Sequence, residues 1–296
     1  MKNVINYYYN IFFNDIHQRK QNFYFDLNDV RYFFILFEGD ITSLQTAYKL
    51  QEELIQRNIY VHQIILNKDK QIVTFVNGNS YILLKALYYK EKINFNNVIS
   101  FSKIIINTNH NHNWQKLWSE KNDHIEYQIN QTRNRYPLIS ESYNYFLGLG
   151  ENSIQLLNII KTANIPQVIA HKRINNNSTV FELYNPLNLI IDSRIRDIAE
   201  YFKSSFFSGQ NINDELENFL KKAKLTTAEY YLFLARMLYP TYYFDAYENI
   251  LNGKKEEKEI KKIINKVNDY EKILKKIYNY YKQFLMMTPI EWLETI

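Results

Sequence analysis

Residues 165–202 read IPQVIAHKRINNNSTVFELYNPLNLIIDSRIRDIAEYF. An apolar run that ends in HKR at 171–173 predicts a strand, and an asparagine-rich polar turn follows it. A second apolar run ends at Asp192 and predicts another strand, after which a helix is expected to begin near Arg196. We expect any chemistry of the chain to be concentrated in this hairpin.

The order of elements in the hairpin is that of a kinase active centre. There, an HxD loop supplies the base that accepts the substrate proton, and a second aspartate on a later strand holds magnesium on the nucleotide phosphates. Arg173 stands at the position of the base, and a guanidinium cannot accept a proton because it stays charged at any accessible pH. We therefore expect a degenerate catalytic hairpin at 165–197 without a catalytic residue, in which His171, Arg173 and Asp192 are vestigial positions.

The first 87 residues predict a small antiparallel sheet with one helix. Residues 42–57 carry apolar side chains at helical spacing, and Thr42 or Ser43 is the expected N-cap. The dipeptides Asn28-Asp29 and Asn77-Gly78 predict turns between strands. The strands themselves are predicted from alternating or continuous apolar runs at 4–13, 22–27, 31–37, 61–66, 72–76 and 79–84.

The remainder of the chain, residues 88–296, is expected to be mainly helical, after a hinge near residues 84–90. Thr226 or Thr227 is the expected cap of one helix, and Pro240 is expected to open the next. Residues 98–106 could be either helix or strand. Longer helices are predicted at 114–133, at 138–161 and, as one amphipathic helix, at 254–284. The predicted fold class is thus α+β, a bilobal protein-kinase-like fold with a small antiparallel sheet lobe (1–87) and a larger, mainly helical lobe (88–296).

Other parts of a phosphotransferase site are missing from the sequence. Gly39 is the first glycine of the chain, so no glycine-rich phosphate loop precedes it. The strand predicted at 31–37 carries Tyr, Phe and Ile where the phosphate-pairing lysine would be expected. Glu52 or Glu53 could be the partner of such a lysine, but solvated charges on a helix are the simpler interpretation.

Three further features have both a functional and a structural interpretation. Asp192 is a candidate metal ligand, although one carboxylate with water is a weak magnesium site; otherwise it is a turn residue or helix N-cap next to Arg194 and Arg196. His110 and His112 are spaced like metal ligands, but a polar linker explains them as well, because no third ligand is nearby. Gly148 and Gly150 resemble part of a nucleotide fingerprint but follow no strand, so close helix packing or a bend is the preferred interpretation.

Composition excludes several classes of protein. The 296 residues are 46% hydrophobic, which excludes a disordered chain, and the absence of cysteine excludes disulfides and thiolate metal sites. No apolar run approaches 18 residues and no signal peptide is evident, so we expect an intracellular protein without a transmembrane segment. The net charge of +5 with 26 Tyr and 19 Phe admits single-strand nucleic-acid binding. A low-GC genome explains the excess of Asn, Lys, Ile, Tyr and Phe more simply, so we expect no nucleic-acid partner.

Several phrases together resemble a known family. These are PLISESYNYFLGLGENSIQLL at 137–157, HKR at 171–173, NLIIDSRIRDIAEYFK at 188–203 and LARMLYPTYYFDAYENIL at 234–251. In combination they are similar to spore coat kinase-like proteins of the YutH and CotS type, in the aminoglycoside and choline kinase superfamily. The resemblance is good over 114–251 and looser before it. It implies a bilobal kinase-like fold and a role in building the spore envelope of an endospore-forming bacterium.

The superfamily pattern can be carried onto a few positions of this sequence. His171 matches the histidine of the HxD loop, which mostly orients that loop, and Arg173 replaces the catalytic aspartate. Asn177 or Ser178 falls near the metal-binding asparagine. The resemblance also implies that Asp192 matches the metal-binding aspartate and Asp197 a structural one.

The resulting functional hypothesis is a pseudokinase. It would act in spore coat assembly through contacts with other coat or sporulation proteins, inside the sporulating cell and then in the spore coat, with no cofactor. The alternative is an active phosphotransferase of the aminoglycoside or choline kinase type, with ATP and magnesium bound in an atypical nucleotide site and Asp192 as metal ligand. The oligomeric state and the identity of the partners do not follow from the sequence.

Overall fold

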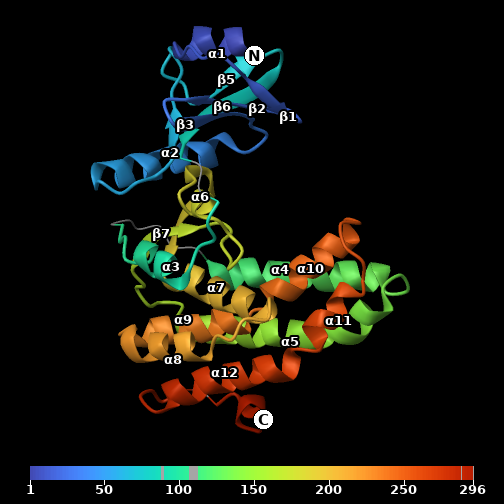
Figure 1. Cartoon of the computed structure of the whole chain (residues 1–296). Coiled ribbons are helices and arrows are strands. Elements are labelled where there is room, and N and C mark those ends of the chain that lie inside the picture. Colours follow the sequence, from blue (N-terminus) through green and yellow to red (C-terminus); the bar gives the residue numbers. More distant parts are fainter. Residues whose placement is uncertain (88–89, 107–112, 288, 296) are drawn as a thin grey trace. The chain divides into compact units, whose positions relative to one another are not determined.

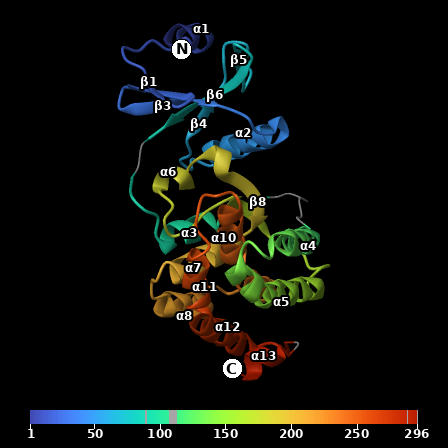
Figure 2. The same ribbon diagram turned by 90° about the vertical axis from the view of Figure 1, so that its right-hand side faces the viewer.

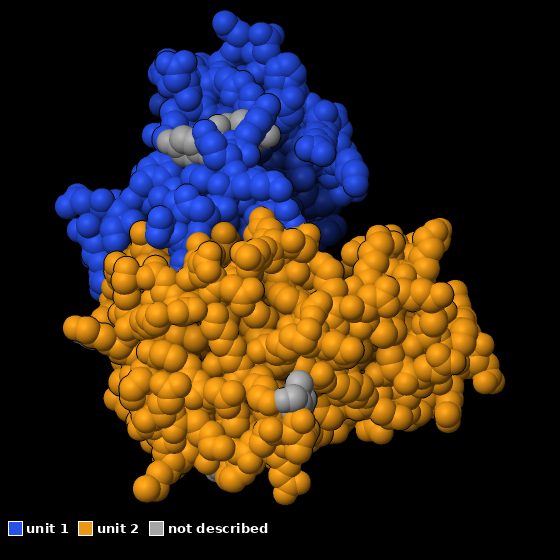
Figure 3. Space-filling model, turned by 60° about the horizontal axis from the view of Figure 1, so that its bottom comes forward, with its two compact units in different colours: residues 1–97, 169–191 blue, residues 98–168, 192–296 orange. Residues whose placement is uncertain are grey.

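The computed structural model describes residues 1–87, 90–106, 113–287 and 289–295. These residues form two compact units, coloured separately in Figure 3. The first unit consists of residues 1–97 and 169–191, and the second of residues 98–168 and 192–296. The chain therefore passes from one unit to the other three times. Among the described residues, the helices lack the combination of length and apolar character that crossing a bilayer would require.

An antiparallel sheet and two helices form most of the first unit. The strand order is β1-β2-β3-β6-β4, and β5 also pairs with β6. Two tight turns have the positive φ that the predicted turn residues favour: Asn28 and Asp29 at 51° and 61°, and Asn77 and Gly78 at 50° and 80°. The elements are α1 (Lys2–Tyr9), β1 (His17–Arg19), β2 (Asn22–Leu27), β3 (Val30–Leu36), α2 (Ile41–Gln56), β4 (Gln63–Ile65), β5 (Thr74–Val76) and β6 (Asn79–Ala86).

Both faces of this sheet are covered, with α1 on one side and α2 on the other (Figures 1 and 2). Successive residues of β6 point to opposite faces, as the strand period of two requires. Leu83 packs with Ile5 and Tyr9 of α1, whereas Ile82 and Leu84 pack with Leu44 of α2. Because β6 is apolar on both sides, it reads in the sequence as a continuous apolar run rather than an alternating one.

The first helix was predicted as a strand, and that prediction was wrong. Residues 4–13 are apolar in a run that fits either structure, and short runs cannot be assigned by periodicity alone. Ile5 and Tyr9 lie four residues apart and are both buried, which is helical spacing, and Asn10 ends the helix in the left-handed conformation with φ 52°. The helix at 42–57 is confirmed as α2, but its N-cap is Asp40, whose carboxylate accepts a hydrogen bond from the Ser43 amide.

The hairpin predicted at 165–197 forms, with β7 (Gln167–His171) and β8 (Leu189–Ser193) as a two-stranded sheet. Its connection holds α6 (Val180–Leu183) and a single 3-10 turn at Pro186–Asn188. The sequence predicts the whole hairpin in the helical lobe, whereas residues 169–191 belong to the first unit. The physical reason is apolar packing, because Phe181 and Leu187 join the cluster of buried side chains beneath α2.

Helices dominate the second unit. The two longest, α4 and α5, lie side by side (Figure 1), α5 also packs on α9, and α9 packs on α7. The segment at 98–106, left open between helix and strand, is helical up to Phe101 and has an isolated bridge at Ile105. The helices are α3 (Phe95–Phe101), α4 (Trp114–Thr132), α5 (Pro137–Ile159), α7 (Ile195–Phe207), α8 (Asn213–Lys222), α9 (Thr227–Leu238), α10 (Thr241–Leu251), α11 (Glu259–Ile264), α12 (Val267–Lys282) and α13 (Glu291–Thr295).

The predicted N-caps of two helices in this unit can be compared with the structure. Thr226 caps α9 in a full capping box with Glu229, and Pro240 is the N-cap of α10, as expected. The single long helix predicted at 254–284 is wrong, since α11 and α12 are separate. The break lets Lys266 turn its ammonium to the last carbonyl oxygens of α7, 2.8 Å from that of Phe207, and a cation is favourable at a helix C-terminus.

Gly148 and Gly150 lie inside α5 and differ in what surrounds them. A Cβ atom on Gly150 would come within 2.6 Å of the side-chain amide of Asn122 on α4, whereas a Cβ on Gly148 would meet nothing within 4 Å. Gly150 therefore permits the close approach of α4 and α5, which confirms helix packing as its interpretation. The pair does not form a nucleotide loop, because both residues are helical.

Candidate functional site

In the described part of the first unit, the positions where a kinase has its glycine loop and strand lysine hold other residues. The turns that join β1 to β2 and β2 to β3 contain Lys20-Gln21 and Asn28-Asp29, without a glycine. On β3, the basic residue is Arg31 at the start of the strand. Its guanidinium forms two hydrogen bonds of 2.7 and 2.8 Å with the carboxylate of Asp26 on β2. This pair lies at the exposed edge of the strand and holds two strands together.

The acidic residues of α2 are also engaged within their own helix. Glu53 pairs with Arg57, four residues further on, and Glu52 accepts a hydrogen bond of 3.1 Å from Gln51. Gln51 is only 2% exposed, and its Oε1 accepts a hydrogen bond from the backbone amide of Ile64. The simpler interpretation of Glu52 and Glu53 as charges on a helix is therefore confirmed, and the buried polar residue of α2 supports strand β4.

His171 and Arg173 lie where the hairpin leaves β7. The His171 ring is buried, and its Nε2 donates a hydrogen bond of 2.8 Å to the carbonyl oxygen of Leu183 in α6. Arg173 is exposed, and its backbone is held by Asn188. The Arg173 amide donates to Asn188 Oδ1 at 3.1 Å, and its carbonyl accepts from Asn188 Nδ2 at 2.8 Å. Both residues thus shape the loop, consistent with the expected orienting role of His171.

The loop positions proposed for a metal-binding asparagine are part of a polar turn. Asn177 accepts a hydrogen bond from the Lys92 ammonium at 3.0 Å, and its amide donates to the side chain of Asn175. Ser178 accepts a hydrogen bond from the Asn175 amide at 3.2 Å. The Asn177 Oδ1 atom, which would be the metal ligand, instead accepts a hydrogen bond from the ammonium of Lys92.

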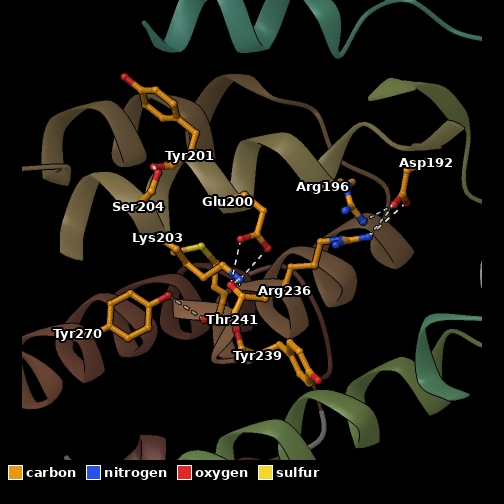
Figure 4. Close-up of polar contacts among 11 residues, drawn as sticks. Asp192, Arg196, Glu200, Tyr201, Lys203, Ser204, Arg236, Tyr239, Thr241 and Tyr270 are labelled. Carbon is orange, nitrogen blue, oxygen red and sulfur yellow. Dashed lines mark hydrogen bonds and ion pairs between the residues drawn. The ribbon is translucent and has the colours of Figure 1, made fainter. Parts of the chain in front are cut away.

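The carboxylate of Asp192, at the end of β8, accepts several hydrogen bonds (Figure 4). Asp192 is 2% exposed. Arg236 of α9 reaches both of its oxygens with one nitrogen, at 3.2 and 3.1 Å, and Arg196 of α7 donates at 3.0 Å. The indole N–H of Trp114 and the amide of Ser193 donate to its Oδ1 at 3.2 and 2.6 Å. Two cations and two neutral donors therefore engage the two carboxylate oxygens.

Trp114 completes this arrangement through its ring. The guanidinium carbons of Arg236 and Arg196 lie 4.6 and 4.9 Å from the ring centroid, a distance at which cation–π attraction operates. Arg236 is 2% exposed. Burial lowers the pKa of Arg236, and the nearby Asp192 carboxylate partly offsets that effect. Arg236 and Asp192 thus form a buried ion pair, in which each charge is stabilised by the other instead of by water.

A second ion pair joins Glu200 and Lys203 of α7 and contacts the end of α9 and the start of α10. The ammonium of Lys203 is 2.8 Å from Glu200 and also donates to the Tyr239 carbonyl and the Thr241 hydroxyl, at 3.1 and 2.9 Å (Figure 4). Burial lowers the pKa of Lys203, an effect that Glu200 partly offsets. Burial by itself raises the pKa of Glu200, but attraction to Lys203, together with Arg236 and Arg196, outweighs it and holds the pKa below its usual value.

This geometry does not fit a magnesium ion at Asp192. Magnesium demands oxygen ligands close to octahedral geometry, whereas both oxygens of Asp192 already accept hydrogen bonds from guanidinium groups. The described residues also contain no cluster of three or more metal-ligating side chains. Asp197 is buried in the first turn of α7, and the N-cap of that helix is Arg194 rather than Asp192. His110 and His112 lie outside the described residues.

The sequence placed Asp192 next to Arg196, four residues away, but gave no partner role to Trp114 or Arg236. Arg236 did leave a signal, because it is a cation within the apolar helix YYLFLARML. A charge at such a position is almost never fully buried unless it is paired. A search among the acidic residues for a partner of Arg236 could therefore have identified its pairing with Asp192.

Comparison with known proteins places these observations in a family. The family described as "Spore coat putative kinase YutH" matches residues 2–277. The chain belongs to this family. A relative of this YutH-family chain is the endospore coat-associated protein YutH of Bacillus subtilis (strain 168), which is 25% identical over 289 residues and is matched over 85% of each chain. The predicted resemblance is therefore confirmed.

Solved structures share the fold of this YutH-family chain. The aminoglycoside phosphotransferase from Alicyclobacillus acidocaldarius matches with a TM-score of 0.67 at 10% identity, covering 100% of this chain and 97% of the other. Spectinomycin phosphotransferase APH(9)-Ia, solved with ADP and spectinomycin, matches with a TM-score of 0.59 at 12% identity, covering 99% and 95%. At such identities the likeness concerns the fold alone. It confirms the predicted kinase-like fold with an antiparallel sheet and a mainly helical part.

Proposed function

We propose that this YutH-family protein is a non-catalytic, kinase-like component of the spore coat. In this proposal it acts through contacts with other coat or sporulation proteins and uses neither a nucleotide nor a metal ion. The observation that carries the proposal is the engagement of Asp192 by Arg236, Arg196 and Trp114. The carboxylate that would hold magnesium in a kinase is used here as a buried structural ion pair.

Phosphoryl transfer rests almost entirely on positioning and electrostatic stabilisation, so the absence of several of these groups supports a non-catalytic role. The base position is Arg173, the metal-ligand position is paired with arginines, and β3 offers Arg31 bound to Asp26. Each change removes a different part of the machinery. Because these changes occur together, they support a protein that has kept the kinase-like fold for contacts with other proteins and not for catalysis.

The location follows from the family. The Bacillus subtilis relative is named as endospore coat-associated, and we extend that location to this chain. The protein would be made in the sporulating cell and become part of the coat. Its partners would be other proteins of that structure.

Thermal unfolding of the purified protein with ATP and magnesium tests the non-catalytic proposal. A ligand of the native state at about 100 times its Kd stabilises the fold by about 2.7 kcal/mol, which raises Tm by several degrees. We expect no such shift. Arg173→Asp, which restores the acidic base position alone, should also show no shift and no release of ADP.

The matched control for this experiment is Asp192→Asn, which keeps the shape of the side chain and removes its charge. A magnesium-dependent shift in the wild-type protein that is lost in Asp192→Asn would contradict the proposal and support the alternative of an atypical phosphotransferase. The comparison uses the shift caused by ligand within each variant, because the substitution also changes the stability of the protein without ligand.

Fractionation of spores from the source organism tests the location. We expect an antibody against this chain to detect it in the extract of coat proteins and not in the fraction released from the spore core. Detection in the core alone would contradict the proposed location. A second antibody against a core enzyme controls for the separation of the two fractions.

A further inference from the structure

A pocket of about 290 Å³ lies entirely within the second unit. It is formed by the start of α4, the end of α5 with the segment that follows, the end of β8 and one side chain of α9. Leu157, Ile160 and Leu232 supply apolar walls, whereas Gln115, Lys161 and Ser193 supply polar groups. The volume is at the lower limit of the range of about 300–1,000 Å³ typical of small-molecule pockets. An occupant is thereby limited to one ring or a short chain.

The charge balance around the pocket favours an anion. Among the described residues, its wall contains one cation, Lys161, and one anion, Asp192. The Asp192 carboxylate is already paired with Arg196 and Arg236, so its charge is balanced within the protein. The neighbouring Glu200 on α7 is likewise paired, with Lys203. Lys161 is the exposed cation of the group and is positioned to meet a ligand.

Ser193 adds a hydrogen-bonding group that the protein itself leaves unused. The residue is 3% exposed, and within the described part of the chain its hydroxyl has no hydrogen-bond partner. Buried hydroxyls are normally paired, because an unpaired one costs about 1–3 kcal/mol. The side-chain amide of Gln115 also lines the pocket. The pocket thus combines hydrogen-bonding groups from Ser193 and Gln115 and the ammonium of Lys161 with an apolar wall.

We propose that this pocket binds a small carboxylate with an apolar body, such as an aromatic or short aliphatic acid. The carboxylate would be held by Lys161 and by hydrogen bonds from neighbouring polar groups, and the apolar body would lie against Leu157, Ile160 and Leu232. This site goes beyond the proposed function, which needs no small ligand, so either can fail without the other. Asp192 lines the pocket, so an occupant would lie next to its ion pairs with Arg196 and Arg236.

Ligand-observed NMR titration of the full chain tests the proposal with three probes. Benzoate is the proposed class, benzamide is its neutral counterpart and benzylamine is its cationic one. We expect benzoate to bind with a Kd of about 1 mM, as is reasonable for so small a ligand. Benzamide should bind at least about threefold more weakly, because it lacks the charge that meets Lys161. Benzylamine should not bind detectably.

Three variants locate the site. Lys161→Met should weaken benzoate about threefold to tenfold and leave benzamide unchanged, whereas Ala163→Phe should fill the pocket and abolish both. Lys103→Met, which removes another exposed lysine of the same unit, should change neither. Equal binding of benzoate and benzamide, or benzoate binding that is insensitive to both Lys161→Met and Ala163→Phe, would overturn the proposal. Absence of benzoate binding at about ten times the expected Kd would also overturn it.

Discussion

Replacing Arg236 with methionine is expected to lower the free energy of unfolding by about 3 kcal/mol. Methionine occupies much of the same volume but leaves Asp192, at 2% exposure, without the guanidinium that reaches both of its oxygens. Removal of one partner of a buried ion pair costs about 3–5 kcal/mol. We expect the lower end because Arg196 still pairs with Asp192, at 3.0 Å. Urea unfolding followed by circular dichroism measures the difference.

Two further variants separate the ion pair from other causes. The double variant Asp192→Asn with Arg236→Met should recover part of the loss, because no uncompensated charge then remains buried. Lys272→Met removes one partner of an exposed pair whose side chains are 70% and 69% exposed, and it should cost less than about 1 kcal/mol. A loss below about 1 kcal/mol for Arg236→Met would show that the buried pair contributes little to stability.

Lowering the pH from about 6.5 to about 4 is expected to destabilise the first unit through His62. Burial lowers the pKa of His62 to about 4, from an ordinary value of 6.5. The unfolded chain therefore takes up a proton below pH 6.5 while the folded chain does not. The contribution of His62 is complete above pH 6.5 and is lost as the pH falls towards 4, by up to about 3 kcal/mol.

The measurement is the free energy of unfolding at several pH values in the wild-type protein and in His62→Leu. The wild-type value should fall more steeply between pH 6.5 and pH 4 than that of the variant, since leucine does not titrate. His124→Gln, at an exposed position of α4, controls for the loss of an imidazole elsewhere. Parallel curves for the wild-type protein and His62→Leu would contradict the prediction.

The sequence predicted elements well wherever local chemistry specifies them. The strands β2 and β3 are separated by Asn28-Asp29, which adopts the positive φ that such turns need, so their ends could be predicted closely. Prediction failed where contacts between distant parts of the chain determine the secondary structure. Helix α1 is helical because Ile5 and Tyr9 fit one side of a sheet, and the break before α12 lets Lys266 reach the end of α7. Neither cause is local.

The same contrast between local sequence and tertiary contacts applies to the candidate site. His171, Arg173 and Asp192 could be identified because they follow strands in a recognisable order. What Asp192 does could not be predicted, since its partners Trp114 and Arg236 lie 78 and 44 residues away in the sequence. A carboxylate in a motif has the same appearance whether it meets a metal ion or a guanidinium. Only the three-dimensional contacts distinguish the two.

The division of the first unit has a consequence for biosynthesis. Residues 1–97 leave the ribosome first, but Phe181 and Leu187, which pack beneath α2, follow only after residues 98–168 have been translated. Until then, apolar side chains such as Ile64 and Leu84 lack part of their cover. A nascent chain in this state exposes surface that favours aggregation. We therefore expect a fragment that stops at residue 97 to be poorly soluble.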